Sequence, residues 1–209
     1  MKGWIRLGLE KGIVTTSFPR EKPEVLSPWA TEPVRIYPGA TECPTNAIDG
    51  DMVDRFRCIY CGRCSSSFAP TERLNVPEVK AKVKLFAKSM KLFVIDTGSC
   101  GGCNSEVQQL WNPIYDLSRL GVFFTNTPRH ADALLVVGIL AEGMEKPLLE
   151  AYSAIPDPKI VFAVGSCSVS GGILGKSVAS VLDCKVLIPG CPPDPFSIID
   201  AIQKSRGLE

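Results

Sequence analysis

The pattern of hydrophobic and polar positions changes character near residue 92. From there on, short apolar runs rich in Val, Ile and Phe are typical of strands buried on both faces of a parallel sheet. We predict strands at 92–96, 133–139, 159–164 and 185–188, with a weaker one at 122–125. Helix-length stretches lie between them at 104–120 (broken at Pro113), 143–154, 174–182 and 195–205. This alternation predicts an α/β fold, an open parallel sheet with right-handed crossovers.

The chain before residue 92 is organised differently. Residues 1–36 are interrupted by four prolines and cannot form a core of their own, so we expect an extended docking arm ordered against a neighbouring subunit, or else a frayed terminus. Residues 37–75 hold four cysteines among turn-forming residues, and such a segment needs a metal to fold. Apolar residues then recur at helical spacing, which predicts a linker helix over 76–90 before the domain at 91–209.

Composition and charge exclude some classes of function. Apolar residues make up 45% of the chain, and the net charge is +1. A chain without a basic excess is a poor nucleic-acid binder, so we expect no nucleic-acid partner. No apolar run reaches the roughly 18 residues that span a bilayer, and the N-terminus lacks a secretory signal pattern. We therefore expect a cytosolic chain, unless other subunits hold it to a membrane.

The nine cysteines are the unusual feature of the composition. Their number is odd, they are clustered, and a reducing compartment keeps thiols free or bound to metal, so disulfides are not expected. The alternatives are zinc, iron–sulfur clusters or scattered core cysteines.

Four cysteines follow strands of the predicted sheet. Cys100 and Cys103 come after the strand at 92–96, Cys167 after 159–164, and Cys191 after 185–188. Loops that follow parallel strands leave from one edge of the sheet, so the four thiols can converge there. Four thiolates at one point suit a 4Fe–4S cluster or a zinc ion. Cys184 precedes its strand, at the opposite edge, and is expected to be structural or incidental.

The other four cysteines are Cys43, Cys58, Cys61 and Cys64. The last three form a C-x-x-C-x-x-C motif that resembles a two-cluster bacterial ferredoxin with one site erased. That resemblance adds Cys43, which precedes a proline, as the fourth ligand of one 4Fe–4S cluster. Phe68 stands where the lost site would have its own last cysteine. A structural zinc site is the alternative.

Several motifs after residue 90 share one wider resemblance. They are Cys-Gly-Gly-Cys-Asn-Ser-Glu at 100–106, Pro-Arg-His-Ala-Asp at 128–132, Gly-Ser-Cys at 165–167 and Pro-Gly-Cys-Pro-Pro at 189–193. Together they resemble the small subunits of nickel–iron hydrogenases, especially the membrane-bound energy-converting type, and their relative in respiratory complex I. The two glycines between Cys100 and Cys103 resemble the hydrogenase branch, because the complex I relative has adjacent cysteines there.

This resemblance implies a flavodoxin-like domain and assigns Cys100, Cys103, Cys167 and Cys191 to a proximal 4Fe–4S cluster. It places the nickel–iron centre in a separate large subunit. Glu106 matches an acidic position near the proton route of the energy-converting enzymes, although a carboxylate favoured by the helix dipole is the alternative. Residues 12–16 resemble more weakly the leader of a ferredoxin-like subunit of the same complexes.

The expected function is that of an electron-transfer small subunit with two 4Fe–4S clusters, peripheral on the cytoplasmic face of a membrane complex. Its expected partners are the nickel–iron large subunit, a ferredoxin-like or other electron-input subunit, and membrane-arm subunits. The alternatives are a subunit of a quinone or sulfur-compound reductase related to complex I, and a zinc-stabilised assembly subunit. His130, the only histidine, excludes a multi-histidine metal site and has either a packing role or a proton-relay role.

Overall fold

A six-stranded sheet forms the centre of the computed structural model, which describes residues 3–12, 15–21, 31–39, 42–74 and 76–208. The strand order is β5 (Glu78–Val79), β10 (Val186–Ile188), β9 (Ile160–Val164), β8 (Ala133–Val137), β6 (Met90–Asp96) and β7 (Val122–Phe124). All neighbouring strands are parallel except β5, which runs antiparallel to β10. The predicted α/β fold with a parallel sheet is confirmed.

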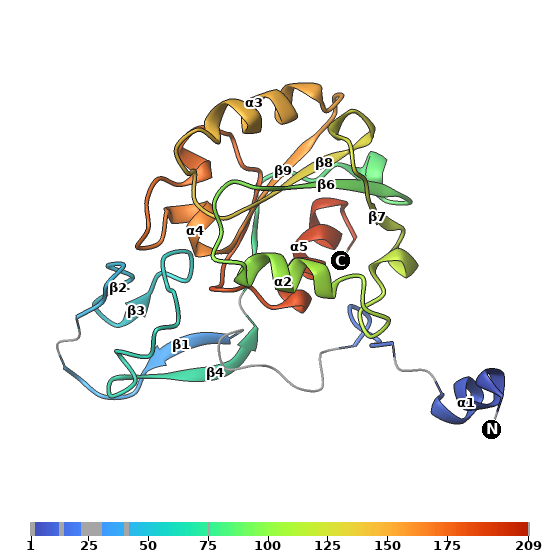
Figure 1. Ribbon diagram of the computed structural model, residues 1–209. Helices are drawn as coiled ribbons and strands as arrows, with labels where there is room; N and C mark the ends of the chain where they lie inside the picture. The colour runs from blue at the N-terminus through green and yellow to red at the C-terminus, as the bar shows by residue number, and fades with distance from the viewer. Residues whose placement is uncertain (1–2, 13–14, 22–30, 40–41, 75, 209) are drawn as a thin grey trace.

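Helices cover both faces of this sheet (Figure 1). On one face lie α2 (Gly102–Gln109) and α5 (Pro195–Ser205), and on the other lies α3 (Glu145–Ala154). The short α4 (Gly165–Ser170) follows β9 at the carboxyl edge, where Val169 packs against the core on the α3 side. Every residue of β8 and β9 is buried, as expected of strands covered on both faces. No helix among the described residues is both long and apolar enough to cross a membrane.

Two of the predicted helices are wrong. In place of a linker helix over 76–90, β5 pairs with β10 and a single 3-10 turn follows at Lys84–Phe86. The backbone of this segment is bonded to the sheet rather than to itself, since Lys80 N donates to Lys185 O at 2.8 Å. Its apolar side chains pack against the core without forming a helix. At 174–182 only a 3-10 turn forms, at Val178–Ser180. The carbonyl of Lys176, which a helix would bond to its own backbone, accepts from Leu140 N at 2.8 Å.

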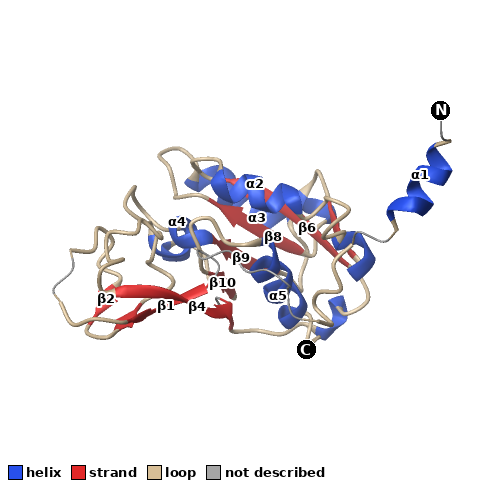
Figure 2. Cartoon of the chain, turned by 90° about the horizontal axis from the view of Figure 1, so that it is seen from below, coloured by secondary structure: helices blue, strands red, loops and turns tan. Residues whose placement is uncertain are grey.

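The N-terminal half contains two small two-stranded antiparallel sheets beside the main sheet (Figure 2). The strand β1 (Thr31–Arg35) pairs with β4 (Phe68–Leu74), and β2 (Ile48–Asp49) pairs with β3 (Met52–Val53). Residues 31–35, part of the predicted arm, therefore pair with the cysteine-rich segment.

Part of the predicted arm packs on the chain's own α/β domain. Thr16 N donates to Ile114 O at 2.7 Å, and the buried Phe18 ring meets Phe196 edge to face at 5.1 Å. The helix α1 (Trp4–Lys11) projects from the rest of the molecule in both views (Figures 1 and 2). Residues 13–14 and 22–30 lie outside the described residues, and docking of the arm on a partner subunit stays a prediction.

Candidate functional site

The loop after β6 is organised by Asp96, the last residue of that strand. Its carboxylate accepts hydrogen bonds from the backbone N–H groups of Gly98 and Ser99, both at 2.8 Å, and from Asn104 Nδ2 at 2.5 Å. Burial raises the pKa of Asp96, but these hydrogen bonds outweigh it and hold that pKa below its usual value. The ionised side chain thus fixes the turn that carries Cys100 and ties it to α2.

Gly165 marks the point where three loops meet. Its φ is +85°, and a Cβ added there would lie 2.7 Å from Cys103 Sγ and 3.3 Å from Gly190 O. A Cβ on Gly102 would lie 3.7 Å from both Cys100 Sγ and the Cβ of Pro192. The loops after β6, β9 and β10 therefore converge at one edge of the sheet, as the positions of the cysteines predict.

The four cysteines of these loops influence one another electrostatically. Burial, and then repulsion from the other thiolates, raises the pKa of Cys103 to about 12 and that of Cys191 to about 11. The pKa of Cys167 is raised by burial and by Cys100. The thiols of Cys103, Cys167 and Cys191 are therefore neutral at pH 7 on their own, so binding of a cationic metal group must displace protons from them.

The chemistry of this donor set fits an iron–sulfur cluster. The four thiols come from loops that converge at one edge of the sheet, glycines lie against the sulfurs of Cys100, Cys103 and Cys167, and thiolates are the ligands that such clusters use. Among the described residues, no group of three or more His, Cys, Asp or Glu side chains lies close enough to hold one metal ion.

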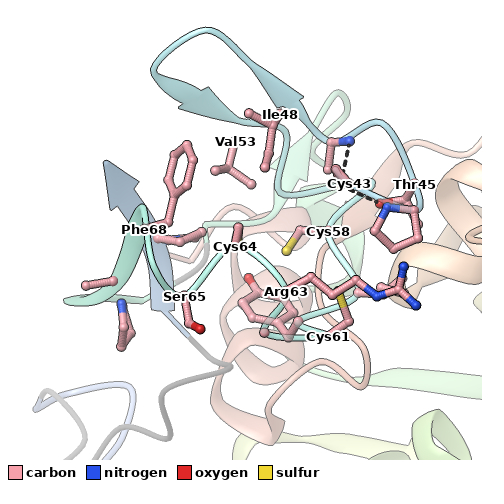
Figure 3. Close-up of a pocket in the computed structure, with 18 of the residues that line it drawn as sticks. Cys43, Thr45, Ile48, Val53, Cys58, Cys61, Arg63, Cys64, Ser65 and Phe68 are labelled. Carbon is pink, nitrogen blue, oxygen red and sulfur yellow. Dashed lines mark hydrogen bonds between the residues drawn. The ribbon is translucent and has the colours of Figure 1, made fainter. Parts of the chain in front are cut away.

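The N-terminal cysteines line a pocket of their own (Figure 3). It is lined by Cys43, Cys58, Cys61 and Cys64, together with apolar side chains that include Ile48 and Phe68. Burial raises the pKa of Cys58 to about 11, with smaller contributions from the other three thiolates. The structure thus brings together the four residues that the ferredoxin resemblance selects.

Cys43 differs from its neighbours in this pocket. Its Sγ accepts a hydrogen bond from Ala47 N at 3.2 Å and lies 3.5 Å from Thr45 Oγ1 (Figure 3). Burial raises the pKa of Cys43, but these hydrogen bonds outweigh it and lower the net value. Cys43 is thus prepared to act as a thiolate, since N–H donors to a ligand sulfur stabilise its charge.

Glu106 lies in α2, on the same helix as Cys103, among other titratable groups. Burial raises its pKa, and the carboxylate of Asp194 raises it further. The same two carboxylates, after burial, raise the pKa of Tyr115. Glu106 therefore belongs to a small group of side chains that disfavour negative charge and could hold a proton.

Two residues noted in the sequence lie away from both cysteine groups. Cys184 is buried in the core on the α3 face of the sheet, where burial raises its pKa to about 12. His130 is exposed in a 3-10 turn that leads into the start of β8. It lies at the edge opposite the cysteine loops, so it does not belong to their site.

Sequence reasoning missed two polar residues of the site. Asp96 could have been found, because a carboxylate that ends an apolar strand before Thr-Gly-Ser is typical of a side chain that caps a turn. Ser166 could not have been found, because its role depends on a partner 108 positions away in the sequence. Its hydroxyl donates to Cys58 O at 2.7 Å.

The motifs at the C-terminal cysteines lie in a region that matches a known protein family. Residues 100–205 match the family described as NADH ubiquinone oxidoreductase, 20 Kd subunit. The chain belongs to this family. The match spans the loops of Cys100, Cys103, Cys167 and Cys191 and confirms the resemblance found in the sequence.

Relatives of this 20 kDa subunit family include hydrogenase subunits. The chain is 33% identical over 141 residues to formate hydrogenlyase subunit 7 of Escherichia coli, covering 64% of this chain and 55% of that one. It is 36% identical over 126 residues to the probable membrane-bound hydrogenase subunit mbhJ of Pyrococcus furiosus, covering 57% and 75%. Membership of the family makes this chain a subunit of an oxidoreductase complex.

A solved structure has the same fold. A chain in the structure of the membrane-bound sulfane sulfur reductase, an archaeal respiratory membrane complex, aligns with a TM-score of 0.53 at 30% identity. The alignment covers 59% of this chain and 71% of that one. The similarity supports the fold of the 20 kDa subunit family for the α/β domain.

Proposed function

We propose that this chain is the electron-transfer small subunit of a membrane-bound nickel–iron hydrogenase. In this proposal Cys100, Cys103, Cys167 and Cys191 hold one 4Fe–4S cluster, and Cys43, Cys58, Cys61 and Cys64 hold a second. The observation that carries the proposal is the convergence of the first four cysteines within the family's matched region, 100–205. The nickel–iron centre belongs to a large subunit, and the chain is peripheral, on the cytoplasmic face of the complex.

When bound, a 4Fe–4S cluster takes up and releases one electron at a time. The residues of this chain bind it, exclude water and set its potential through burial and through hydrogen bonds to sulfur. At the N-terminal site the N–H of Ala47 serves this purpose at Cys43, since it donates to the sulfur at 3.2 Å. Glu106 is proposed to hold a proton beside the C-terminal site, where burial and Asp194 keep its pKa raised.

Metal and sulfide analysis of the anaerobically purified full chain tests the cofactor proposal. We expect about eight iron and eight sulfide ions per chain, four of each from each thiolate-bound cluster. Cys103→Ser and Cys61→Ser should each lose about half of that iron, because each variant removes one ligand of a different cluster. Cys184→Ser is the matched control and should keep all of it. Zinc without sulfide would refute the proposal and favour the structural zinc alternative.

A sulfur-compound reductase is the second candidate function. The structural similarity to a chain of the sulfane sulfur reductase complex favours it. Both candidates keep the two clusters and differ in the large subunit. The sequence of the partner large subunit separates them, because four nickel-binding cysteines are expected in a hydrogenase and none in the relative.

A further inference from the structure

Ser166 forms a direct connection between the two cysteine sites. Its side chain is buried, with 1% of the residue exposed. Its hydroxyl donates to Cys58 O at 2.7 Å and lies 3.2 Å from Gly190 O, while its backbone N–H donates to Gly190 O at 2.8 Å. One buried serine thus contacts backbone from both halves of the chain.

The residues in these contacts are cysteine ligand candidates or their direct neighbours in the sequence. Cys58 belongs to the N-terminal site, Ser166 directly precedes Cys167, and Gly190 directly precedes Cys191. The path from Cys58 to Cys167 therefore consists of covalent bonds and one hydrogen bond. A hydroxyl suits this position, because Cys58 O and Gly190 O both only accept and the hydroxyl supplies the donor proton that neither carbonyl has.

The neighbouring serine on α4 shows that burial alone does not create this contact. Ser168 is fully buried, yet its Oγ has no hydrogen-bond partner among the residues that the structure describes. The backbone at Ser166 is held in place as well, because Ser170 Oγ donates to Ser166 O at 2.8 Å. The hydrogen bond to Cys58 O is only partly buried, but a half-buried carbonyl that loses its donor still forfeits that bond, so the Cys58 carbonyl depends on Ser166.

We propose that Ser166 is a positioning residue that fixes the N-terminal cysteine site against the C-terminal one and supplies the hydrogen-bonded path for electrons between them. This inference rests on the proposed function. In the transfer, one electron leaves the group held at Cys43, Cys58, Cys61 and Cys64, which is oxidised, and reduces the group held at Cys100, Cys103, Cys167 and Cys191. Ser166 keeps its proton, and a low-potential one-electron donor supplies the electron.

The test compares Ser166→Thr with Ser166→Val in the full chain. These two side chains have nearly the same shape, but only threonine keeps the hydroxyl. Freeze-quench electron paramagnetic resonance after photoreduction measures how fast the electron moves between the sites. At equal iron content we expect Ser166→Val to be about tenfold slower than Ser166→Thr, since loss of a residue that orients ligands costs that much or more. Ser168→Ala is the control and should match the unaltered chain.

Each outcome decides the inference. Loss of iron from the N-terminal site in Ser166→Val, but not in Ser166→Thr, would also support it, because Cys58 would then have lost its anchor. Equal transfer rates and equal iron in these two variants would overturn the inference and leave the two-cluster function standing. If the unaltered chain binds iron and sulfide at neither site, the proposed function fails and the inference fails with it.

Discussion

Replacing Gly165 with alanine tests the convergence of the cysteine loops most directly. The residue has a φ of +85°, and the new Cβ would lie 2.7 Å from Cys103 Sγ. The left-handed backbone costs an alanine about 1–2 kcal/mol. Crowding against a packed core group adds about 1–3 kcal/mol. The expected loss of stability is therefore about 2–5 kcal/mol, together with displacement of Cys103 from the site.

Gly143→Ala separates the two contributions. Gly143 has nearly the same φ, +83°, but a Cβ added there meets nothing within 4 Å. This control should lose only the backbone cost of about 1–2 kcal/mol and keep its iron. Urea denaturation measures the difference in unfolding free energy, and iron and sulfide analysis measures the occupancy of the site. If both variants shift the urea midpoint equally and both keep their iron, Cys103 does not lie against Gly165.

Three further changes test other parts of the structure. Arg206→Met should cost about 3 kcal/mol or more in urea unfolding, because the buried guanidinium donates to the backbone carbonyls of Phe86, Ala87 and Leu120. Burial and Asp194 raise the pKa of Glu106 in the folded protein, so its ionised carboxylate destabilises the fold. Glu106→Gln should therefore stabilise the chain at pH values above that folded pKa, and the gain should vanish below the pKa of Glu106 in the unfolded chain. Urea midpoints measured across this pH range test the expectation. Phe18→Ala should cost at most about 3 kcal/mol and speed limited proteolysis of the arm, because it removes the contact with Phe196.

The parallel strands could be predicted from the sequence because they are buried on both faces. Residues 133–137 and 160–164 are continuous apolar runs, and such runs between helix-length stretches leave few other folds open. The convergence of Cys100, Cys103, Cys167 and Cys191 followed from the same rule, since the loops after parallel strands share an edge. Here local pattern and tertiary structure agree.

The linker could not be predicted because its partner is remote in sequence. Val79 belongs to a series of apolar residues at helical spacing, yet in the structure it is a strand residue that lies opposite Val186 in the register of β5 and β10. An edge strand takes its hydrogen bonds from a neighbour that no local pattern reveals. The bond from Ser166 to Cys58 escaped prediction for the same reason, since it joins residues 108 positions apart.

The antiparallel strand β5 also bears on how such a chain can be assembled. It joins the sheet at the free edge of β10, outside the strands that fill the interior. Extra chain paired at an edge covers backbone groups that would otherwise attract foreign strands, and here its apolar side chains also pack against the core. The family's matched region starts only at residue 100. A fold with this edge can therefore acquire an N-terminal extension by fusion, and the ladder of β5 and β10 then ties that extension to the strand that leads into Cys191.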